Sequence, residues 1–236
     1  QNGIATSDMV INVALSGTAT AGADFTAPPA TVTIAAGQTT ATLLVPSMLY
    51  RLLEAPEARG HDLSSLQTIY YGASPMSPAR LKQLRERFGE VFVQIYAASE
   101  HAGATVSMSK DEHQPDRNGD ESHLASAGRT VPGVELVIVD RRGRRVPQGQ
   151  DGEIWMRSRA TCLGYLNAPE KTAEEFCDGY WKSGDFGRID ANGFVYVLDR
   201  LKDTILCNER NVYPSLVEAA LSAHPSVLMA AVVGIA

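Results

Sequence analysis

The sequence predicts a mixed α/β protein that is preceded by a short all-β segment. The first 45 residues hold only two charged side chains, Asp8 and Asp24, and are rich in Thr, Ala, Gly and alternating Val or Ile. Beyond Pro46 charged residues become frequent, and short apolar runs typical of strands alternate with helical patterns. The change near residue 45 therefore indicates a boundary between two kinds of structure.

In the first segment, polar and apolar residues alternate over 9–16 and 30–45, between glycines and prolines, which predicts three short strands joined by turns. In the second, Ser77 and Pro78 begin a helix in which Leu81, Leu84 and Phe88 recur on one face. Apolar runs predict strands over 91–95, 134–139, 152–156 and 194–198, with a turn over 140–143. A second helix is expected from Pro214, followed by a strand over 228–235.

Composition and charge bound the functions that this chain can have. Its 236 residues suffice for one large domain or two small ones, and its net charge of -6 argues against a nucleic-acid or anionic-lipid surface. We expect no transmembrane segment, because no run of about 18 apolar residues is present. Cys162, Cys177 and Cys207 show no paired spacing, so we expect a reducing, cytoplasmic setting in which all three are buried.

Tyr96, Ser99 and Glu100 directly follow the predicted strand over 91–95 and form the first candidate site. An aromatic ring can stack on a base, a hydroxyl can donate to a phosphate, and a carboxylate can hold Mg²⁺. The alternative is a strand-end tyrosine beside a solvated glutamate, and the spacing alone leaves both interpretations open.

Gly184 and Asp185 form a second candidate site. A glycine lets the backbone approach a ligand, and an aspartate can accept hydrogen bonds from two adjacent ribose hydroxyls. However, Ser183-Gly184-Asp185 is also a common turn. The charged run over 199–203 is a third candidate, which could equally be a solvated strand end.

The order of several short motifs decides between these interpretations. They are Tyr70-Tyr71-Gly72-Ala73-Ser74-Pro75-Met76, Tyr96 to Glu100, Gly152-Glu153-Ile154 with Gly164-Tyr165, Trp181 to Asp185, Asp199 to Asp203, and Asn211-Val212-Tyr213-Pro214. This order resembles the class I adenylate-forming (AMP-binding) superfamily, in its acyl-CoA synthetase branch, over residues 46–236. The resemblance implies a partial large domain over 44–201, with a sheet and a small β-barrel-like subdomain, and the start of an α+β lid over 202–236.

The resemblance also implies the chemistry. A carboxylic acid, expected to be a fatty acid, reacts with ATP in the presence of Mg²⁺ to give an acyl-adenylate, and CoA then displaces AMP. The residues that match family positions are Gly72, Ala73 and Ser74 beside adenine and the acyl group, Tyr96 on the adenine, Ser99 facing a phosphate, Glu100 on Mg²⁺, Asp185 and Arg200 on the ribose, and Lys202 as the hinge of the lid.

The family's phosphate loop would precede Pro46, and its catalytic lysine would follow Ala236; we find neither motif within the chain. Removing one such electrostatic group costs on the order of 100-fold to 1,000-fold in rate. We therefore expect this chain alone to show no turnover and at best weak nucleotide binding. No protein or nucleic-acid partner is expected.

Residues 1–45 resemble the middle of a Calx-beta domain, an extracellular or surface β-sandwich that can bind Ca²⁺, over 17–25, 31–34, 37–38 and 41–43. Asp24 matches a Ca²⁺ ligand of that family, but one aspartate cannot supply six to eight oxygen ligands. We hypothesise a fusion of a Calx-beta-like segment over 1–43 with the ligase part. Two alternatives remain: a β-sandwich binding module with an inert ligase portion, and a sensor of AMP or acyl-adenylate.

Overall fold

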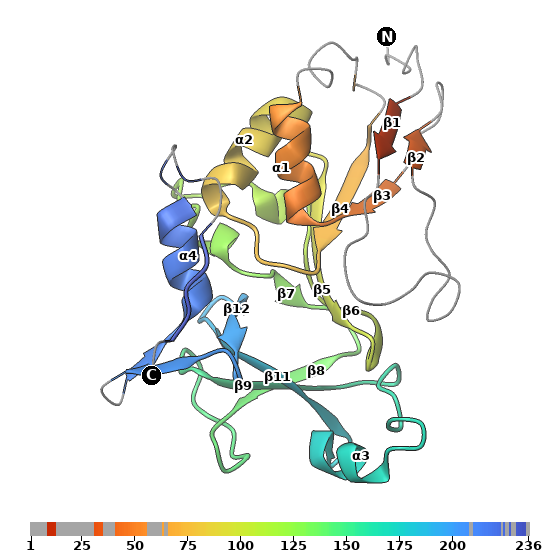
Figure 1. Cartoon of the computed structure of the whole chain (residues 1–236), viewed down its shortest axis with the longest axis vertical. Helices are drawn as coiled ribbons and strands as arrows, with labels where there is room; N and C mark the ends of the chain where they lie inside the picture. Colours follow the sequence, from red (N-terminus) through yellow and green to blue (C-terminus); the bar gives the residue numbers. More distant parts are fainter. Residues whose placement is uncertain are drawn as a thin grey trace.

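The computed structural model describes residues 9–12, 31–34, 41–55, 63, 66–207, 210–222, 224, 227 and 230–234. Within them the chain forms two five-stranded sheets, arranged as two layers below and beside a pair of helices (Figure 1). No helix in these ranges is long and apolar enough to cross a bilayer. The expected mixed α/β class is thus confirmed.

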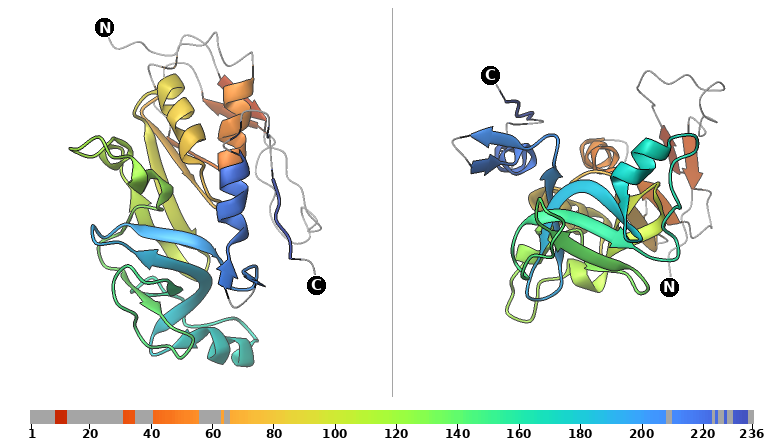
Figure 2. Two further views of the ribbon diagram at one scale, coloured as in Figure 1. Left: turned by 90° about the vertical axis from the view of Figure 1, so that its left-hand side faces the viewer. Right: turned by 90° about the horizontal axis from the view of Figure 1, so that it is seen from below.

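The first sheet has the order β3-β4-β5-β6-β7, with β3, β4 and β5 parallel and the last two strands antiparallel. Helices α1 and α2 lie along one of its faces (Figure 2). Leu49, Leu81 and Leu84 are fully buried there against Tyr71 and Phe92. The bounds are β3 (Ala41–Leu44), α1 (Pro46–Glu54), β4 (Thr68–Gly72), α2 (Pro78–Phe88), β5 (Phe92–Ala98), β6 (His101–Met108), η2 (Asp111–His113), η3 (Ser122–Ala125) and β7 (Arg129–Thr130).

The second sheet has the order β10-β11-β9-β8, and β12 pairs with the C-terminal half of β11, over residues 185–189. Its buried face carries Ile154, Met156 and Val195, which form one apolar cluster with Val106 of the first sheet. This shared cluster fixes the two sheets against each other. The bounds are β8 (Glu135–Val139), β9 (Gly152–Arg157), α3 (Pro169–Glu175), β10 (Phe176–Cys177), β11 (Tyr180–Ile189) and β12 (Val195–Arg200).

The C-terminal part holds β13 (Ile205–Cys207), β14 (Arg210–Val212) and α4 (Pro214–Ser222). The backbone N–H of Ser215 donates to Asp199 at 3.0 Å, which anchors the start of α4 to β12. The Tyr213 ring stacks on Phe186 of β11 at 5.6 Å. The strand expected over 228–235 is wrong for the described residues 230–234, because none of them pairs with a neighbouring strand.

Local patterns predicted α2 and α4, but they predicted neither α1 nor α3, and the strand ends were predicted less well. Helix α2 begins after Ser77 and ends before Gly89, as expected, although the Ser77 hydroxyl makes no capping bond. Strand β5 runs on to Ala98, so Tyr96 lies inside the strand rather than after it. Of the cysteines, Cys162 and Cys207 are exposed and Cys177 is half-buried, so the expected burial of all three is wrong. Cys177 lies in the short strand β10 and Cys207 in the short strand β13.

The N-terminal segment differs from the expected three-stranded fragment. Strands β1 (Met9–Asn12) and β2 (Thr31–Ile34) pair only with each other, in antiparallel register. Strand β3 instead pairs in parallel with β4 and joins the first sheet, with Thr42 in register with Ile69 and Leu44 in register with Tyr71. It thus crosses the boundary that we placed between residues 43 and 44.

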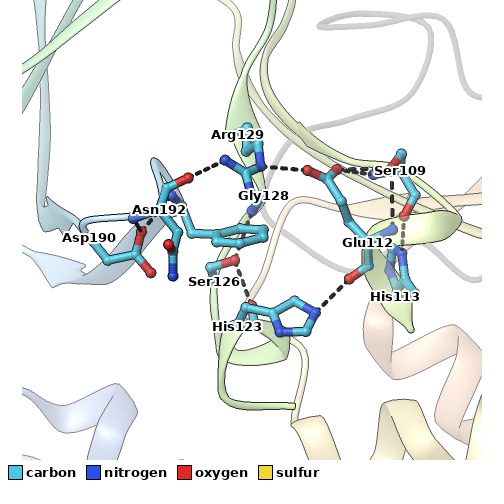
Figure 3. Close-up of polar contacts among 10 residues, drawn as sticks. Ser109, Glu112, His113, His123, Ser126, Gly128, Arg129, Asp190 and Asn192 are labelled. Atoms are coloured by element: carbon cyan, nitrogen blue, oxygen red, sulfur yellow. Dashed lines mark hydrogen bonds and ion pairs between the residues drawn. The ribbon is translucent and has the colours of Figure 1, made fainter. Parts of the chain in front are cut away.

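Arg129 of β7 ties the first sheet to the turn between β11 and β12 (Figure 3). Its Nε lies 2.7 Å from a Glu112 carboxylate oxygen, another guanidinium N–H donates to the Asn192 carbonyl, and the guanidinium lies 4.1 Å from the Phe194 ring centroid. Burial by itself raises the pKa of Glu112, but hydrogen bonds from Ser109 and Arg129 outweigh it and lower the pKa. The ion pair therefore persists well into the acid range.

His113 is buried next to Tyr71 of the first sheet. Its Nδ1 lies 2.6 Å from the Ser109 carbonyl oxygen and therefore carries a proton, while its Nε2 lies 2.9 Å from the Tyr71 hydroxyl. Burial lowers the pKa of His113 below its ordinary value. The neutral ring is therefore the form that fits the core.

The pKa of His113 is lower in the folded chain than in the unfolded chain, so the unfolded chain binds a proton there first. We therefore expect the free energy of unfolding to decrease as the pH falls below about 6.5. Between about pH 7.5 and about pH 5.5 this loss reaches up to about 1.4 kcal/mol, measurable by urea unfolding. His113→Gln removes this contribution, whereas His224→Gln, at an exposed position, retains it. Equal slopes in the wild type and His113→Gln would contradict the assignment.

Candidate functional site

The side chains of Tyr96 and Asp185 meet between the two sheets. Tyr96 lies on β5 and Asp185 on β11, and the phenol hydroxyl donates to Asp185 Oδ2 at 2.5 Å. Burial, and then the neighbouring carboxylate, raise the pKa of Tyr96, so the phenol keeps the proton that it donates. The two motifs that the sequence placed 89 residues apart therefore form one site.

Asp185 is a buried acid, with 9% of its surface exposed. Burial raises its pKa above the ordinary value, against the hydrogen bond from Tyr96 and the charge of Arg200, which lower it. Arg200 faces Asp185 across the β11–β12 pair, with its Nε 3.4 Å from Oδ1. The Ser183 hydroxyl accepts from the Asp185 backbone N–H at 3.0 Å and donates to the Ile154 carbonyl at 2.7 Å. The carboxylate is thus held at a fixed position.

The Ser183-Gly184-Asp185 run is an irregularity within β11 rather than a turn between elements. The register of β11 against β9 shifts between Lys182 and Phe186, and Gly184 adopts a positive φ of 68°. The Gly184 carbonyl accepts from the Leu201 N–H at 2.8 Å, which brings the end of β12 next to this bend. A β-bulge of this kind re-aims the side chain that follows it, here Asp185.

The predicted motif over residues 70–76 lies beside Tyr96, because Gly72 pairs with Ile95 of β5. Gly72 ends β4, and a Cβ at this position would lie 2.2 Å from the Ile95 carbonyl oxygen. Ala73 then takes a left-handed conformation, with φ 67°, and Ala73 and Ser74 are exposed. The loop can therefore approach a ligand that lies over Tyr96.

Ser99 and Glu100 form the turn between β5 and β6, at the same end of the sheet. Ser99 is exposed, and Glu100 Oε1 accepts a hydrogen bond from the Tyr165 hydroxyl at 2.8 Å. Within the described part of the chain, Glu100 Oε2 has no hydrogen-bond or ion-pair partner, and no group of three metal-ligating side chains occurs. Lys202 is exposed in the turn after β12, and Asp24 lies outside the described residues.

Three residues that build this site have no role predicted from the sequence. The Ser183 hydroxyl, within the second candidate motif, holds the Asp185 backbone. Tyr165 belongs to a Gly-Tyr pair, and Glu175, which also contacts the Tyr165 hydroxyl, belongs to no motif. Only the Gly164-Tyr165 pair could have directed attention to this corner.

The chain is similar to known proteins in sequence and in fold. The sequence profile described as AMP-binding enzyme matches residues 5–166. Medium/long-chain-fatty-acid–CoA ligase FadD8 of Mycobacterium tuberculosis is 42% identical over 195 residues, which is 83% of this chain and 33% of that protein. The chain therefore spans about a third of the length of this curated relative.

Two solved structures resemble the fold. The amide bond synthetase McbA from Marinactinospora thermotolerans has a TM-score of 0.76 and 39% identity, covering 83% of this chain and 38% of that one. O-succinylbenzoate coenzyme A synthetase (MenE) from Bacillus subtilis, in complex with AMP, has a TM-score of 0.69 and 30% identity, covering 84% and 38%.

Gly72→Ala tests the close approach of β4 to β5. The added methyl group would overlap the Ile95 carbonyl, so we expect the free energy of unfolding to fall by about 1–3 kcal/mol. Urea unfolding measures this change. Ala73→Gly is the matched control: it relieves a left-handed alanine, so stability should stay equal or rise. A Gly72→Ala chain as stable as the wild type would show that the strands can separate at no cost.

Tyr96→Phe tests the hydrogen bond between the sheets. Since this bond lowers the pKa of Asp185, its removal should raise that pKa further above the ordinary value. A ¹³C NMR titration of the aspartate carboxyl groups would follow the shift. Tyr196→Phe, which removes a hydroxyl 3.4 Å from Asp190 on the same sheet, should leave the Asp185 titration unchanged. An unchanged Asp185 pKa in Tyr96→Phe would exclude the contact in solution.

Proposed function

The chain belongs to the AMP-binding enzyme family, and from that premise we propose that it carries the nucleotide site of an ATP-dependent acid:CoA ligase. The observation that supports this most is the convergence of Tyr96, Asp185 and Arg200 from separate strands of two sheets. A buried carboxylate beside an aromatic ring is suited to an adenosine, whose base can stack on the ring and whose ribose hydroxyls can donate to the carboxylate.

In this proposal each group has one task. Tyr96 stacks on the adenine while its hydroxyl holds Asp185, which accepts from the ribose hydroxyls together with Arg200 as donor. The exposed loop at Gly72, Ala73 and Ser74 lines adenine and the acyl group. Ser99 faces a phosphate, and Lys202 is the hinge for residues 202–236, with the large domain over 44–201.

Glu100 fits a magnesium ligand by the chemistry of its donor atoms. Its carboxylate supplies hard oxygens, one of which is held by Tyr165 while the other has no partner among the described residues. A bound Mg²⁺ would neutralise charge on the phosphates of ATP. Glu100 would hold it in the turn after β5, the strand that carries Tyr96.

The proposed reaction has two steps. A carboxylate oxygen of the acid attacks the α-phosphorus of ATP, the bond to the bridging oxygen breaks, and pyrophosphate leaves. The CoA thiol, losing its proton, then displaces AMP from the acyl carbon to give a thioester. Because the chain covers a third of its relative, the complete reaction is proposed for a protein of that length. A fatty acid is the proposed substrate, and the cytoplasm the proposed location.

The relatives differ in what receives the acyl group. FadD8 is named for CoA, whereas McbA is named an amide bond synthetase. Acyl-adenylate formation is therefore the step that we propose first, with CoA as the proposed acceptor. The family match begins at residue 5 and runs through the segment that resembles Calx-beta, so a separate Ca²⁺-binding module gains no support from it.

Asp185→Asn tests the nucleotide site by calorimetry with AMP. Loss of a charged acceptor for the ribose hydroxyls costs about 1.5–3 kcal/mol, so we expect AMP affinity to fall by at least about tenfold. Asp151→Asn is the control, because Asp151 pairs with Arg188 at 3.2 Å at an exposed place on the same sheet. Equal AMP affinity in all three chains would refute the assignment of Asp185.

A second measurement separates a ligase from a nucleotide sensor. In a protein of the relatives' full length, pyrophosphate release that depends on both ATP and a fatty acid supports the ligase, whereas AMP binding without release by that protein favours the sensor. A wild-type chain that binds neither ATP nor AMP would overturn the proposed function altogether.

A further inference from the structure

The Tyr165 hydroxyl lies between two carboxylates near the end of the first sheet. It is 2.8 Å from Glu100 Oε1 and in contact with Glu175 Oε2. Glu100 comes from the β5–β6 turn and Glu175 from the end of α3, so the hydroxyl joins two regions that are remote in the chain. A phenol has one proton and can donate it to only one carboxylate at a time.

The surroundings of the two carboxylates are unequal. Glu175 has a second partner, because Lys171 Nζ lies 3.8 Å from its other oxygen, Oε1. Glu100 has no cation beside it in the described part of the chain. Among the described residues, the negative charge of Glu100 is therefore offset only by the proton that Tyr165 donates.

The Tyr165 ring is fixed from several sides. It lies edge-on to Phe176 with the centroids 5.7 Å apart, and Lys171 Nζ lies 4.4 Å from the ring centroid. The Tyr165 backbone N–H donates to Thr172 Oγ1 at 2.8 Å. Gly164 permits this packing, since a Cβ there would lie 2.4 Å from Thr172 Cγ2. The hydroxyl is thus presented from a rigid support.

The backbone brings the same two regions together. The Cys162 N–H donates to the Glu100 carbonyl at 2.8 Å, and the Ala102 N–H donates to the Ala160 carbonyl at 3.0 Å. The segment after β9 therefore pairs with the β5–β6 turn like a short extra strand, with His101 opposite Thr161. Tyr165 follows this pairing by three residues, which places its hydroxyl at the Glu100 side chain.

We propose that Tyr165 is the positioning residue for Glu100: its hydroxyl holds one carboxylate oxygen so that the other faces a divalent cation bound with the nucleotide. This inference rests on the proposed function, and it assigns a role to a residue outside the adenosine site. Carboxylates that bind metals are commonly held by a second hydrogen bond, whose loss lowers metal affinity by roughly 10–100-fold. Glu175 and Lys171 form the support on the far side of the phenol.

Tyr165→Phe tests this role, because it keeps the ring and its packing and removes only the hydroxyl. Mn²⁺, observed by electron paramagnetic resonance in the presence of ATP, reports the cation, and calorimetry with AMP in the absence of metal reports the adenosine site. We expect roughly 10–100-fold weaker Mn²⁺ affinity, with AMP affinity unchanged within about twofold. That difference separates positioning of Glu100 from general loss of structure.

Two further variants sharpen the result. Tyr180→Phe is the matched control, since that hydroxyl also donates to a carboxylate, Glu135 at 2.5 Å, elsewhere on the second sheet; Mn²⁺ affinity should not change. In Glu175→Gln the amide can donate to the phenol oxygen, so the phenol proton remains for Glu100 and Mn²⁺ affinity should stay within about threefold.

Each failure has a separate meaning. Unchanged Mn²⁺ affinity in Tyr165→Phe, or an equal loss in Tyr180→Phe or Glu175→Gln, would overturn the role of Tyr165 and leave the proposed function standing. A parallel loss of AMP affinity in Tyr165→Phe would show a structural role instead and overturn the proposal. A wild-type chain that binds neither AMP nor Mn²⁺ with ATP would overturn both.

Discussion

The hydrogen bond from Tyr96 to Asp185 is the interaction on which the site depends. It joins two sheets that are built from different parts of the chain, and it lies where both partners are largely withdrawn from water. A hydrogen bond to a charged group in such surroundings contributes about 1.5–3 kcal/mol, more than an exposed one. The bond can form only because the apolar cluster around Val106, Ile154 and Val195 fixes the sheets against each other.

Two connections hold the β11–β12 pair in place. At one end, Asp185 and Arg200 face Tyr96. At the other end, Arg129 donates to the Asn192 carbonyl and lies over the Phe194 ring, in the turn between the two strands (Figure 3). A strand pair that is held at both ends cannot slide against the first sheet. Beyond Arg200, Ser215 at the start of α4 donates through its backbone N–H to Asp199 and contacts the Leu198 carbonyl, and the Tyr213 ring stacks on Phe186 of β11. These contacts anchor the start of α4 beside the β11–β12 pair.

In the proposed function the polar groups around β5 would divide into an adenosine part and a phosphate part. Tyr96, in the strand, faces Asp185, whereas Glu100, in the turn that follows, faces Tyr165. The end of this one strand would then set the spacing between the ring proposed to stack on adenine and the carboxylate proposed to bind the cation. The loop at Gly72 borders the same strand through its close contact with Ile95. Nucleotide binding and neutralisation of the phosphate charge would therefore both depend on the position of strand β5.

The sequence by itself determined the elements whose signals are local. Helix α2, with a proline at its start and a glycine after its end, and the strands β8 and β9 follow from patterns within about ten residues. The order of the motifs also identified Tyr96, Asp185 and Arg200, and the structure brings these three together. Local pattern suffices there because backbone hydrogen bonding and burial of one face depend on near neighbours.

The tertiary structure alone decided what depends on distant contacts. Strand β3 joined the first sheet because β4 offered a free edge beside it, although its composition matched the segment before it. The exposure of Cys162 and Cys207 depends on which surfaces other layers cover. Glu100 and Tyr165 lie 65 residues apart and meet through a backbone pairing that neither residue encodes. Side-chain hydrogen bonds between remote segments form only after the sheets have packed, so no short sequence pattern predicts them.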